Sequence, residues 1–374
     1  QKEKPISDGW AIIFHGLEEG ESAYNTSDVF HVEEGDEKVP HILVRVEDSR
    51  AEQKFTSRLT IWRCSPDGRE CWPTKISNLP ELVAGKITED PSIAYVRGQP
   101  VISWVEVTPP NSPNNLSNDS TWESVACTGE SLETLEYLVA TKEGSKTKGL
   151  RFVELLDHRI GVSTRPDLDG RKKICFGIAN DWEEITPEFL SSLNEVQGLS
   201  IGGAWGGPDD AELGTPDNIG PDEMVWGGPN DAELLPNGDL SLAMHLGWYE
   251  EKRDNKGDLI KDSRKYVGAH CITELPVGDE PARAKYLKVI AERADFRAIS
   301  NPPRRPDLDE VTYLNFLQTE HLFSPTCTLV ASVGDAAQAG IEIPNPLLKG
   351  WLEDHPEYGE PSELEPADKA TLVA

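Results

Sequence analysis

Apolar and alternating runs of strand length dominate the chain. Each run is bounded by glycine, proline or polar residues, which is typical of short β-strands. Asn237-Gly238-Asp239 and Asp67-Gly68 are hairpin-turn sequences. The pattern therefore predicts an all-β protein. The predicted strands span residues 39–46, 57–64, 100–107, 159–164, 173–178, 240–246 and 326–333.

Helical signals are few. The run Thr186-Pro187-Glu188-Phe189-Leu190 predicts a short helix, because threonine is a favourable N-cap and proline suits the first helical position. Residues 280–288 predict another short turn of helix.

Clusters of polar and aromatic residues recur along the chain, about sixty to eighty residues apart. This spacing is expected when each blade of a small β-propeller sends its innermost strand to one central pocket. We therefore predict a five-bladed β-propeller formed by one domain, residues 1–352. Residues 353–374, which are rich in Glu and Pro, predict a surface tail. The clusters are Ala23-Tyr24-Asn25, Glu89-Asp90-Pro91, Arg151-Phe152-Val153-Glu154, Trp226-Gly227-Gly228-Pro229-Asn230-Asp231 and Arg305-Pro306-Asp307-Leu308-Asp309.

One direct repeat is present. The run Trp205-Gly206-Gly207-Pro208 opens a segment, 205–213, that recurs with few changes at 226–234. The interval is too short for a propeller blade, so we interpret it as a local duplication whose second copy lies in a blade.

The formal net charge is −30. Such a chain is expected to repel nucleic acid and anionic membranes, and a neutral glycan suits it better as a partner. The sequence has no apolar run of membrane-spanning length. It gives no oligomeric state. An anion subsite would require its own arginine cluster.

Several features favour a secreted protein in an oxidising compartment. The chain begins at Gln1 rather than Met, and sequons begin at Asn25, Asn115 and Asn118. Cys64 and Cys71 flank a turn, which predicts a disulfide across a hairpin. The remaining cysteines allow two more bridges with the pairing left open, and they are Cys127, Cys175, Cys271 and Cys327. No spacing indicates a metal site or a cofactor.

A pocket rich in carboxylates, arginine and tryptophan indicates sugar chemistry. Asp231 and Glu233 alternate around Ala232, so a strand would place both on one face, where either is a candidate base for activating water. The alternative is a solvated acidic hairpin. Asp307 and Asp309 have the same spacing, and either is an alternative candidate for the base.

Positive charges are rare near these clusters. Arg151, Arg165 and Arg305 are candidates to bind sugar hydroxyls or an anion, or to hold a carboxylate ionised; structural ion pairing is the alternative. Trp226 and Tyr24 are candidates to stack on a sugar ring, with core packing as the alternative. We interpret His245, which lies in an apolar run, as a core histidine.

The chain resembles the mannosyltransferase/phosphorylase family, glycosyltransferase family 108, which is related to the β-mannoside phosphorylases and hydrolases of glycoside hydrolase family 130. The matching segments follow the family's order over nearly the whole chain. They are Tyr24-Asn25, Glu89-Asp90-Pro91, 151–155, 159–166, Trp226-Gly227-Gly228, 290–296 and 305–308.

The resemblance implies a five-bladed propeller with a central active site and chemistry on mannosides. It implies that Asp90 is the proton donor to the glycosidic oxygen. It also places Asn25 at the pocket, so Asn25 is expected to be unglycosylated. Asn25, and Glu154 and Asp307 of other matching segments, are candidates to bind substrate.

The chain departs from the family after Trp226-Gly227-Gly228. Members tend to carry Asn-Glu and then His there, whereas this chain has Asn230-Asp231-Ala232-Glu233. A carboxylate in place of a phosphate partner favours a hydrolase. The leading hypothesis is therefore a secreted glycoside hydrolase that acts on mannosides. The alternatives are a β-mannoside phosphorylase or mannosyltransferase, and a carbohydrate-binding propeller without catalysis.

Overall fold

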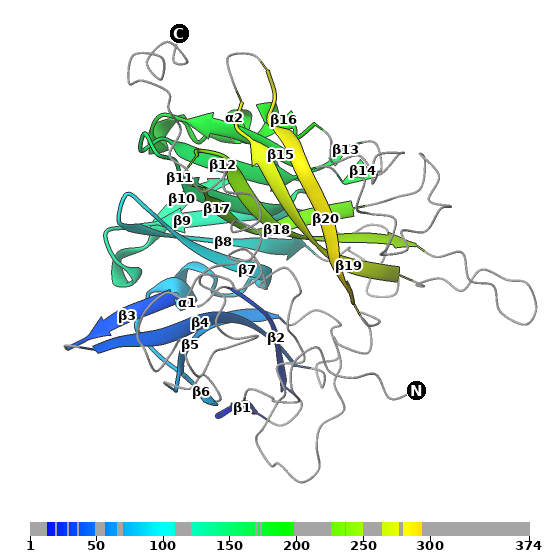
Figure 1. The fold of residues 1–374 in the computed structure, drawn as a ribbon. Helices are drawn as coiled ribbons and strands as arrows, with labels where there is room; N and C mark the ends of the chain where they lie inside the picture. Colours follow the sequence, from blue (N-terminus) through cyan, green and yellow to red (C-terminus); the bar gives the residue numbers. More distant parts are fainter. Residues whose placement is uncertain are drawn as a thin grey trace, which may run out of the picture.

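The computed structural model of the chain is all-β with few helices (Figure 1). Within the described residues, four sheets of four or more strands follow one another along the chain, together with a small two-stranded ribbon. The structure describes residues 13–18, 21–27, 30–35, 37–48, 57–65, 70–108, 121–168, 171–172, 174–197, 226–235, 237–249, 264–276 and 280–293.

The first sheet has the strand order β1-β6-β5-β4-β2, and β3 pairs with β4. Every pairing is antiparallel except that of β1 with β6, which is parallel. The strands are β1 (Ile13–Phe14), β2 (Glu21–Thr26), β3 (Phe30–Glu34), β4 (Glu37–Asp48), β5 (Arg58–Cys64) and β6 (Glu70–Pro73).

The second sheet is an antiparallel meander with the order β10-β9-β8-β7. A short helix, α1 (Leu79–Leu82), precedes it, and the 3₁₀ turn η1 (Leu132–Thr134) joins its last two strands. The strands are β7 (Ile87–Val96), β8 (Gln99–Thr108), β9 (Thr121–Thr128) and β10 (Glu136–Ala140).

The third sheet has the order β11-β12-β15-β16, again antiparallel, and the ribbon β13-β14 follows β12. The 3₁₀ turn η2 (Trp182–Glu184) and helix α2 (Pro187–Ser192) lie between β15 and β16. The strands are β11 (Lys148–Glu154), β12 (Ile160–Arg165), β13 (Asp167–Leu168), β14 (Arg171–Lys172), β15 (Cys175–Ala179) and β16 (Asn194–Glu195).

The fourth sheet has the order β17-β18-β19-β20. Its first strand is the second copy of the sequence duplication, and the first copy lies outside the described residues. The strands are β17 (Trp226–Leu234), β18 (Leu240–Tyr249), β19 (Arg264–Glu274) and β20 (Arg283–Arg293).

Strands at the edges of the four sheets lie side by side. The strands β2, β7, β11 and β17 are each at one edge of their sheet. β7 contacts both β2 and β11, and β11 contacts β17. β4 of the first sheet also contacts β7. Residues far apart in the sequence are thus brought together along these edge strands.

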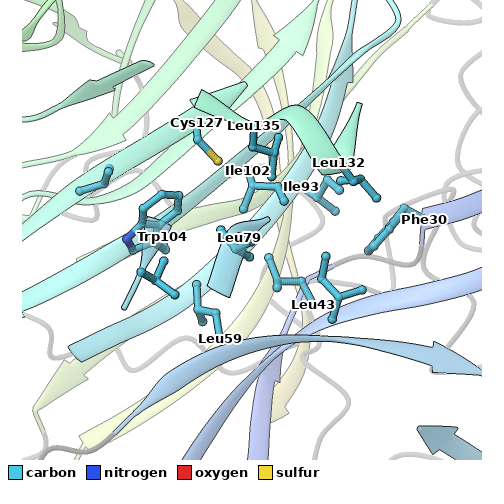
Figure 2. Packing of buried hydrophobic residues seen from close by; sticks show 13 residues of the cluster. Phe30, Leu43, Leu59, Leu79, Ile93, Ile102, Trp104, Cys127, Leu132 and Leu135 are labelled. Atoms are coloured by element: carbon cyan, nitrogen blue, oxygen red, sulfur yellow. The ribbon is translucent and has the colours of Figure 1, made fainter. Parts of the chain in front are cut away.

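Two apolar clusters of the described residues pack against the second sheet, one on each face. Ile102 and Trp104 belong to the cluster shared with the first sheet (Figure 2), whereas Val101 belongs to the cluster shared with the third sheet. Successive strand residues point to opposite faces. A strand that is buried on both faces therefore has apolar residues at successive positions, as residues 100–107 do. In Figure 1 the second sheet lies between the first and the third.

The predicted strands are confirmed wherever the structure describes them; residues 326–333 lie outside the described part. Helix α2 is also confirmed. The Thr186 hydroxyl caps it by accepting a hydrogen bond from the Phe189 amide at 3.1 Å. No helix in the described part is long and apolar enough to cross a membrane.

The helical turn predicted at residues 280–288 is wrong, because most of this segment belongs to strand β20. β20 pairs with β19 from Arg283–Glu274 to Arg293–Tyr266. An unpaired β19 edge would leave a row of backbone N–H and C=O groups without partners, and β20 satisfies them. This tertiary requirement outweighs the local helical preference.

The disulfide predicted between Cys64 and Cys71 is not formed in the structure. The two residues are direct partners across the β5–β6 pair, as expected. Their Sγ atoms are 3.1 Å apart, whereas a disulfide requires about 2.05 Å. Burial, together with the Cys64 thiol, raises the pKa of Cys71 well above its ordinary value. Cys127 and Cys175 are also buried thiols.

Candidate functional site

Asp90 lies at a break in the regular pairing of β7. The register with β8 shifts between Glu89 and Ser92, which marks a β-bulge. Asp90 has φ 48°, in the left-handed region. Aspartate tolerates this region better than most residues, but the following Pro91 disfavours it further. Such backbone strain is found preferentially at functional sites and costs on the order of 1–3 kcal/mol.

Two cations from neighbouring sheets meet Glu89 and Asp90. Arg45 of β4 donates from Nη2 to Glu89 Oε1 at 2.8 Å, and its Nη1 lies 3.6 Å from Asp90 Oδ1. Lys148, the first residue of β11, donates from Nζ to Glu89 Oε2 at 2.9 Å and to Asp90 Oδ2 at 3.0 Å. Three sheets therefore contribute to one cluster of charges.

The members of this cluster differ in exposure. The side chains of Glu89 and Arg45 are only 10% and 11% exposed, and that of Lys148 is 22% exposed. Asp90 is the most accessible, with 30% of its side chain exposed. Asp90 is thus the carboxylate that a ligand can reach, while Glu89 lies deeper and holds the two cations.

The charges act strongly on the two carboxylates. Burial alone raises the pKa of Asp90, but the positive charges of Lys148 and Arg45 outweigh it and hold the pKa well below its usual range. The same cations lower the pKa of Glu89 against the effect of its burial. Burial lowers the pKa of Lys148, but Asp90 and Glu89 raise it above its ordinary value. Both carboxylates are therefore ionised at neutral pH.

Two arginines extend the positive charge across the third sheet. Arg165 of β12 is the backbone partner of Lys148, and its charge also lowers the pKa of Asp90. Arg151 is the partner of Ser163, which is two residues from Arg165 and so on the same face of β12. Both arginines are buried. The described site thus gathers four cationic side chains, although the whole chain is strongly acidic.

An aromatic side chain adjoins this cluster. The Trp122 ring of β9 lies 5.9 Å from Lys148 Nζ and 5.7 Å from Lys146 Nζ, within the range of cation–π contacts. Lys148 thus contacts both the Asp90 carboxylate and the Trp122 ring. No group of three His, Cys, Asp or Glu side chains among the described residues could hold a metal ion.

A sequence profile of one protein family matches this chain over residues 1–222 and 220–349, which together are most of its length. The chain belongs to the DUF1861 family. The family is described as proteins of unknown function, so membership by itself gives no activity. A search of curated protein sequences found no match to this DUF1861 protein.

Solved structures resemble the DUF1861 fold at low sequence identity. A mannose phosphorylase from Leishmania mexicana, solved with a phosphate ion, is 20% identical over 80% of this chain and 76% of its own, with a TM-score of 0.56. A GDP-Man-dependent mannosyltransferase from the same organism is 19% identical over 73% and 71%, with a TM-score of 0.52. A hypothetical protein from Leishmania major is 18% identical over 82% and 79%, with a TM-score of 0.52. At these identities the likeness establishes a shared fold.

The structure brings some of the predicted site residues together. Asp90, Arg151 and Arg165 lie in the region described above. Tyr24 is the backbone partner of Arg45, and a register shift in β2 falls at Asn25, so this part of β2 lies beside the site. The roles predicted for these residues stay predictions.

Glu154 does not join Asp90. It lies at the far end of β11 from Lys148, roughly 20 Å away at about 3.3 Å per strand residue. There Glu154 Oε1 contacts His158 Nδ1 at 2.6 Å, and Oε2 accepts from the Arg97 amide at 2.6 Å. These two hydrogen bonds also lower the pKa of Glu154. Its surroundings indicate a link between the second and third sheets.

The remaining predicted residues are described only in part. Trp226, Asp231 and Glu233 lie on β17, the edge strand that contacts β11, so the structure places their strand beside the site. Arg305, Asp307 and Asp309 lie outside the described residues, as does the predicted tail.

The sequence analysis missed Arg45 and Lys148. The sequence could have identified Arg45, because this arginine interrupts the apolar run of β4 and a buried charge requires a partner. The sequence indicates Lys148 less clearly, since its only distinguishing feature is that it begins the strand that contains Arg151.

Proposed function

We propose that this DUF1861 protein is a carbohydrate-active enzyme that transfers a mannosyl group between a phosphate-bearing donor and a sugar hydroxyl, with Asp90 as the catalytic carboxylate. The observation that carries the proposal is the strained, accessible Asp90 carboxylate with Lys148 and Arg45 against it. An ionised carboxylate suits the acceptance of a proton. The additional positive charge of Arg165 and Arg151 suits an anionic leaving group.

The reaction follows from these roles. The acceptor hydroxyl gives its proton to Asp90 while its oxygen bonds to the anomeric carbon. The bond from that carbon to the phosphate oxygen breaks, and the phosphate departs with the electron pair toward the arginines. Run in reverse, the same step is phosphorolysis, in which the proton passes from the Asp90 carboxyl to the glycosidic oxygen; because Asp90 rests ionised, its resting state favours the transfer direction. The proton-donor role expected from the sequence is thus the reverse half of the same step.

The fold supports this proposal in two ways. The folds with TM-scores above 0.5 include a mannose phosphorylase and a GDP-Man-dependent mannosyltransferase. The side-by-side edge strands β2, β7, β11 and β17 suit four blades of the predicted five-bladed propeller. The predicted fifth blade, with the cluster at residues 305–309, lies outside the described residues.

The test is an assay of mannosyl transfer with a matched variant. Wild-type protein is incubated with mannose 1-phosphate or GDP-mannose and a panel of mannosides, and release of phosphate or GDP is measured. Asp90→Asn should reduce the rate by about a hundredfold to ten-thousandfold, the typical contribution of an acid–base group. Asparagine also favours the left-handed region, so this variant should fold.

Hydrolysis of mannosides is the second candidate. It is favoured by Asp231 and Glu233 on β17, since a hydrolase requires a carboxylate to activate water. Cleavage that proceeds equally well without phosphate would replace the first proposal with this one. Loss of cleavage in only one of Asp231→Asn and Glu233→Gln, with rescue by azide, would then identify the base. Binding of a glycan without turnover would favour a carbohydrate-binding protein. A secreted location stays a prediction.

A further inference from the structure

Lys148 is placed to control the charge state of Asp90. It begins β11 beside Gly149, whose φ of +69° suits glycine and accompanies a register shift in the β11–β12 pairing. Its Nζ lies between the two carboxylates, at 2.9 Å from Glu89 Oε2 and 3.0 Å from Asp90 Oδ2. The β-bulge in β7 and the register shift in the β11–β12 pairing thus both lie next to the Lys148 ammonium group.

The two cations of the cluster differ in the carboxylates that they contact. Arg45 makes its short contact, 2.8 Å, with Glu89, and it reaches Asp90 only at 3.6 Å. Lys148 hydrogen-bonds both carboxylates directly. Charged groups that act on Asp90 from the described elements include Arg45 of β4, Glu89 of β7, Lys148 of β11 and Arg165 of β12. Among these, Lys148 makes the hydrogen bond that fixes a carboxylate oxygen of Asp90.

We propose that Lys148 is a positioning residue that keeps Asp90 deprotonated and fixes its Oδ2, so that the carboxylate stands ready to take a proton from the acceptor hydroxyl. The inference rests on the proposed function, in which Asp90 exchanges that proton. A lysine suits this task because its ammonium can donate to two carboxylates at once. With Lys148 in place, 30% of the Asp90 side chain remains exposed to solvent.

The first readout is independent of activity. Aspartate carboxyl carbons are labelled with ¹³C, the Asp90 signal is assigned by its loss in Asp90→Asn, and the signal is followed from neutral to acidic pH. In wild type Asp90 should stay ionised well below the ordinary aspartate range. Lys148→Met should move its titration upward by roughly 1–3 pH units, the effect of removing an opposite charge within about 4–6 Å.

Two further variants separate charge from structure. Lys148→Arg keeps the positive charge and should preserve the low titration point. Lys142→Met removes a positive charge from the connection between β10 and β11, where the exposed Lys142 Nζ is 3.9 Å from Glu188, and should change nothing at Asp90. If Lys148→Met does not fold, Lys148→Gln gives the same measurement with a polar side chain.

The second readout is the pH dependence of kcat/KM for mannosyl transfer. Its acid limb should move upward in Lys148→Met by the same amount as the Asp90 titration, and Lys148→Arg should restore it. An unchanged Asp90 titration in Lys148→Met would overturn the inference even if transfer occurs. A shifted titration in a protein that transfers no mannose would instead leave the role of Lys148 intact and overturn the proposed function.

Discussion

The charge cluster should depend on the buried carboxylate of Glu89 for stability. Glu89 holds Arg45 and Lys148 through one short hydrogen bond to each, and its side chain is only 10% exposed. Glu89→Gln keeps the shape and one acceptor oxygen, but it places an amide N–H₂ against a cation. Removing one partner of a buried ion pair costs about 3–5 kcal/mol. Because Asp90 still faces both cations, we expect Glu89→Gln to lower the free energy of unfolding by about 3 kcal/mol, the low end of this range.

The dependence on pH follows from the direction of the pKa shift. Glu89 has a lowered pKa in the folded protein. Its contribution to stability is therefore fully present above the ordinary glutamate pKa of about 4.3 and is lost as the pH falls through the lower folded value. The difference in the free energy of unfolding between wild type and Glu89→Gln should therefore be largest at pH 7 and should decrease at acidic pH.

Urea unfolding, followed by tryptophan fluorescence at several pH values, measures this difference. Glu34→Gln is the matched control, because Glu34 pairs with Arg63 at 3.3 Å in an exposed position. Exposed pairs contribute about 0–1 kcal/mol, so this variant should unfold close to wild type. If Glu89→Gln loses no more than Glu34→Gln, the buried charge of Glu89 does not support the cluster, and the reasoning is refuted.

Two further substitutions test the packing between and within sheets. Gly161→Ala should destabilise the protein by about 1–3 kcal/mol, because the added Cβ would lie 2.7 Å from Val153 Cγ1 and 2.9 Å from Phe176 Cζ; an unchanged urea midpoint would contradict this. Arg97→Gly suits the left-handed turn conformation, φ 55°, yet removes side-chain hydrogen bonds to His158 O, Asn180 O and Asp181 Oδ1. It should therefore speed hydrogen exchange in the turns at 155–158 and 180–184, whereas equal exchange would show that these bonds do not hold the two sheets together.

The strands could be predicted from the sequence because the described sheets bury apolar residues at a regular period. The run at 100–107 is continuous rather than alternating since the second sheet is covered on both faces, with Val101 and Ile102 in different clusters. Strand β20 could not be predicted, because it depends on the edge that β19 presents. That edge is a property of the sheet and leaves no local pattern.

The sequence motif pointed to Asp90, whose catalytic role is our proposal, but it did not give the cations that contact this carboxylate. Arg45 and Lys148 are 44 and 58 or more residues from the carboxylates they bind. The bulge at Asp90 and the register of β11 bring these cations and carboxylates together. No short sequence motif predicts either feature. Glu154 shows the converse. It lies three residues from Arg151 in one cluster, but a strand places residues three apart on opposite faces.

The distribution of charge bears on the phosphate-bearing donor of the proposed reaction. A chain with a formal net charge of −30 repels a phosphate-bearing donor at long range. Binding of such a donor therefore requires positive charge concentrated at the site and protected from screening by burial. Arg151 and Arg165 meet both conditions, since they are buried and lie close to Lys148. A site for neutral glycans would need no such concentration of positive charge. Under the proposed function, the two buried arginines would therefore serve to hold the phosphate group of the donor.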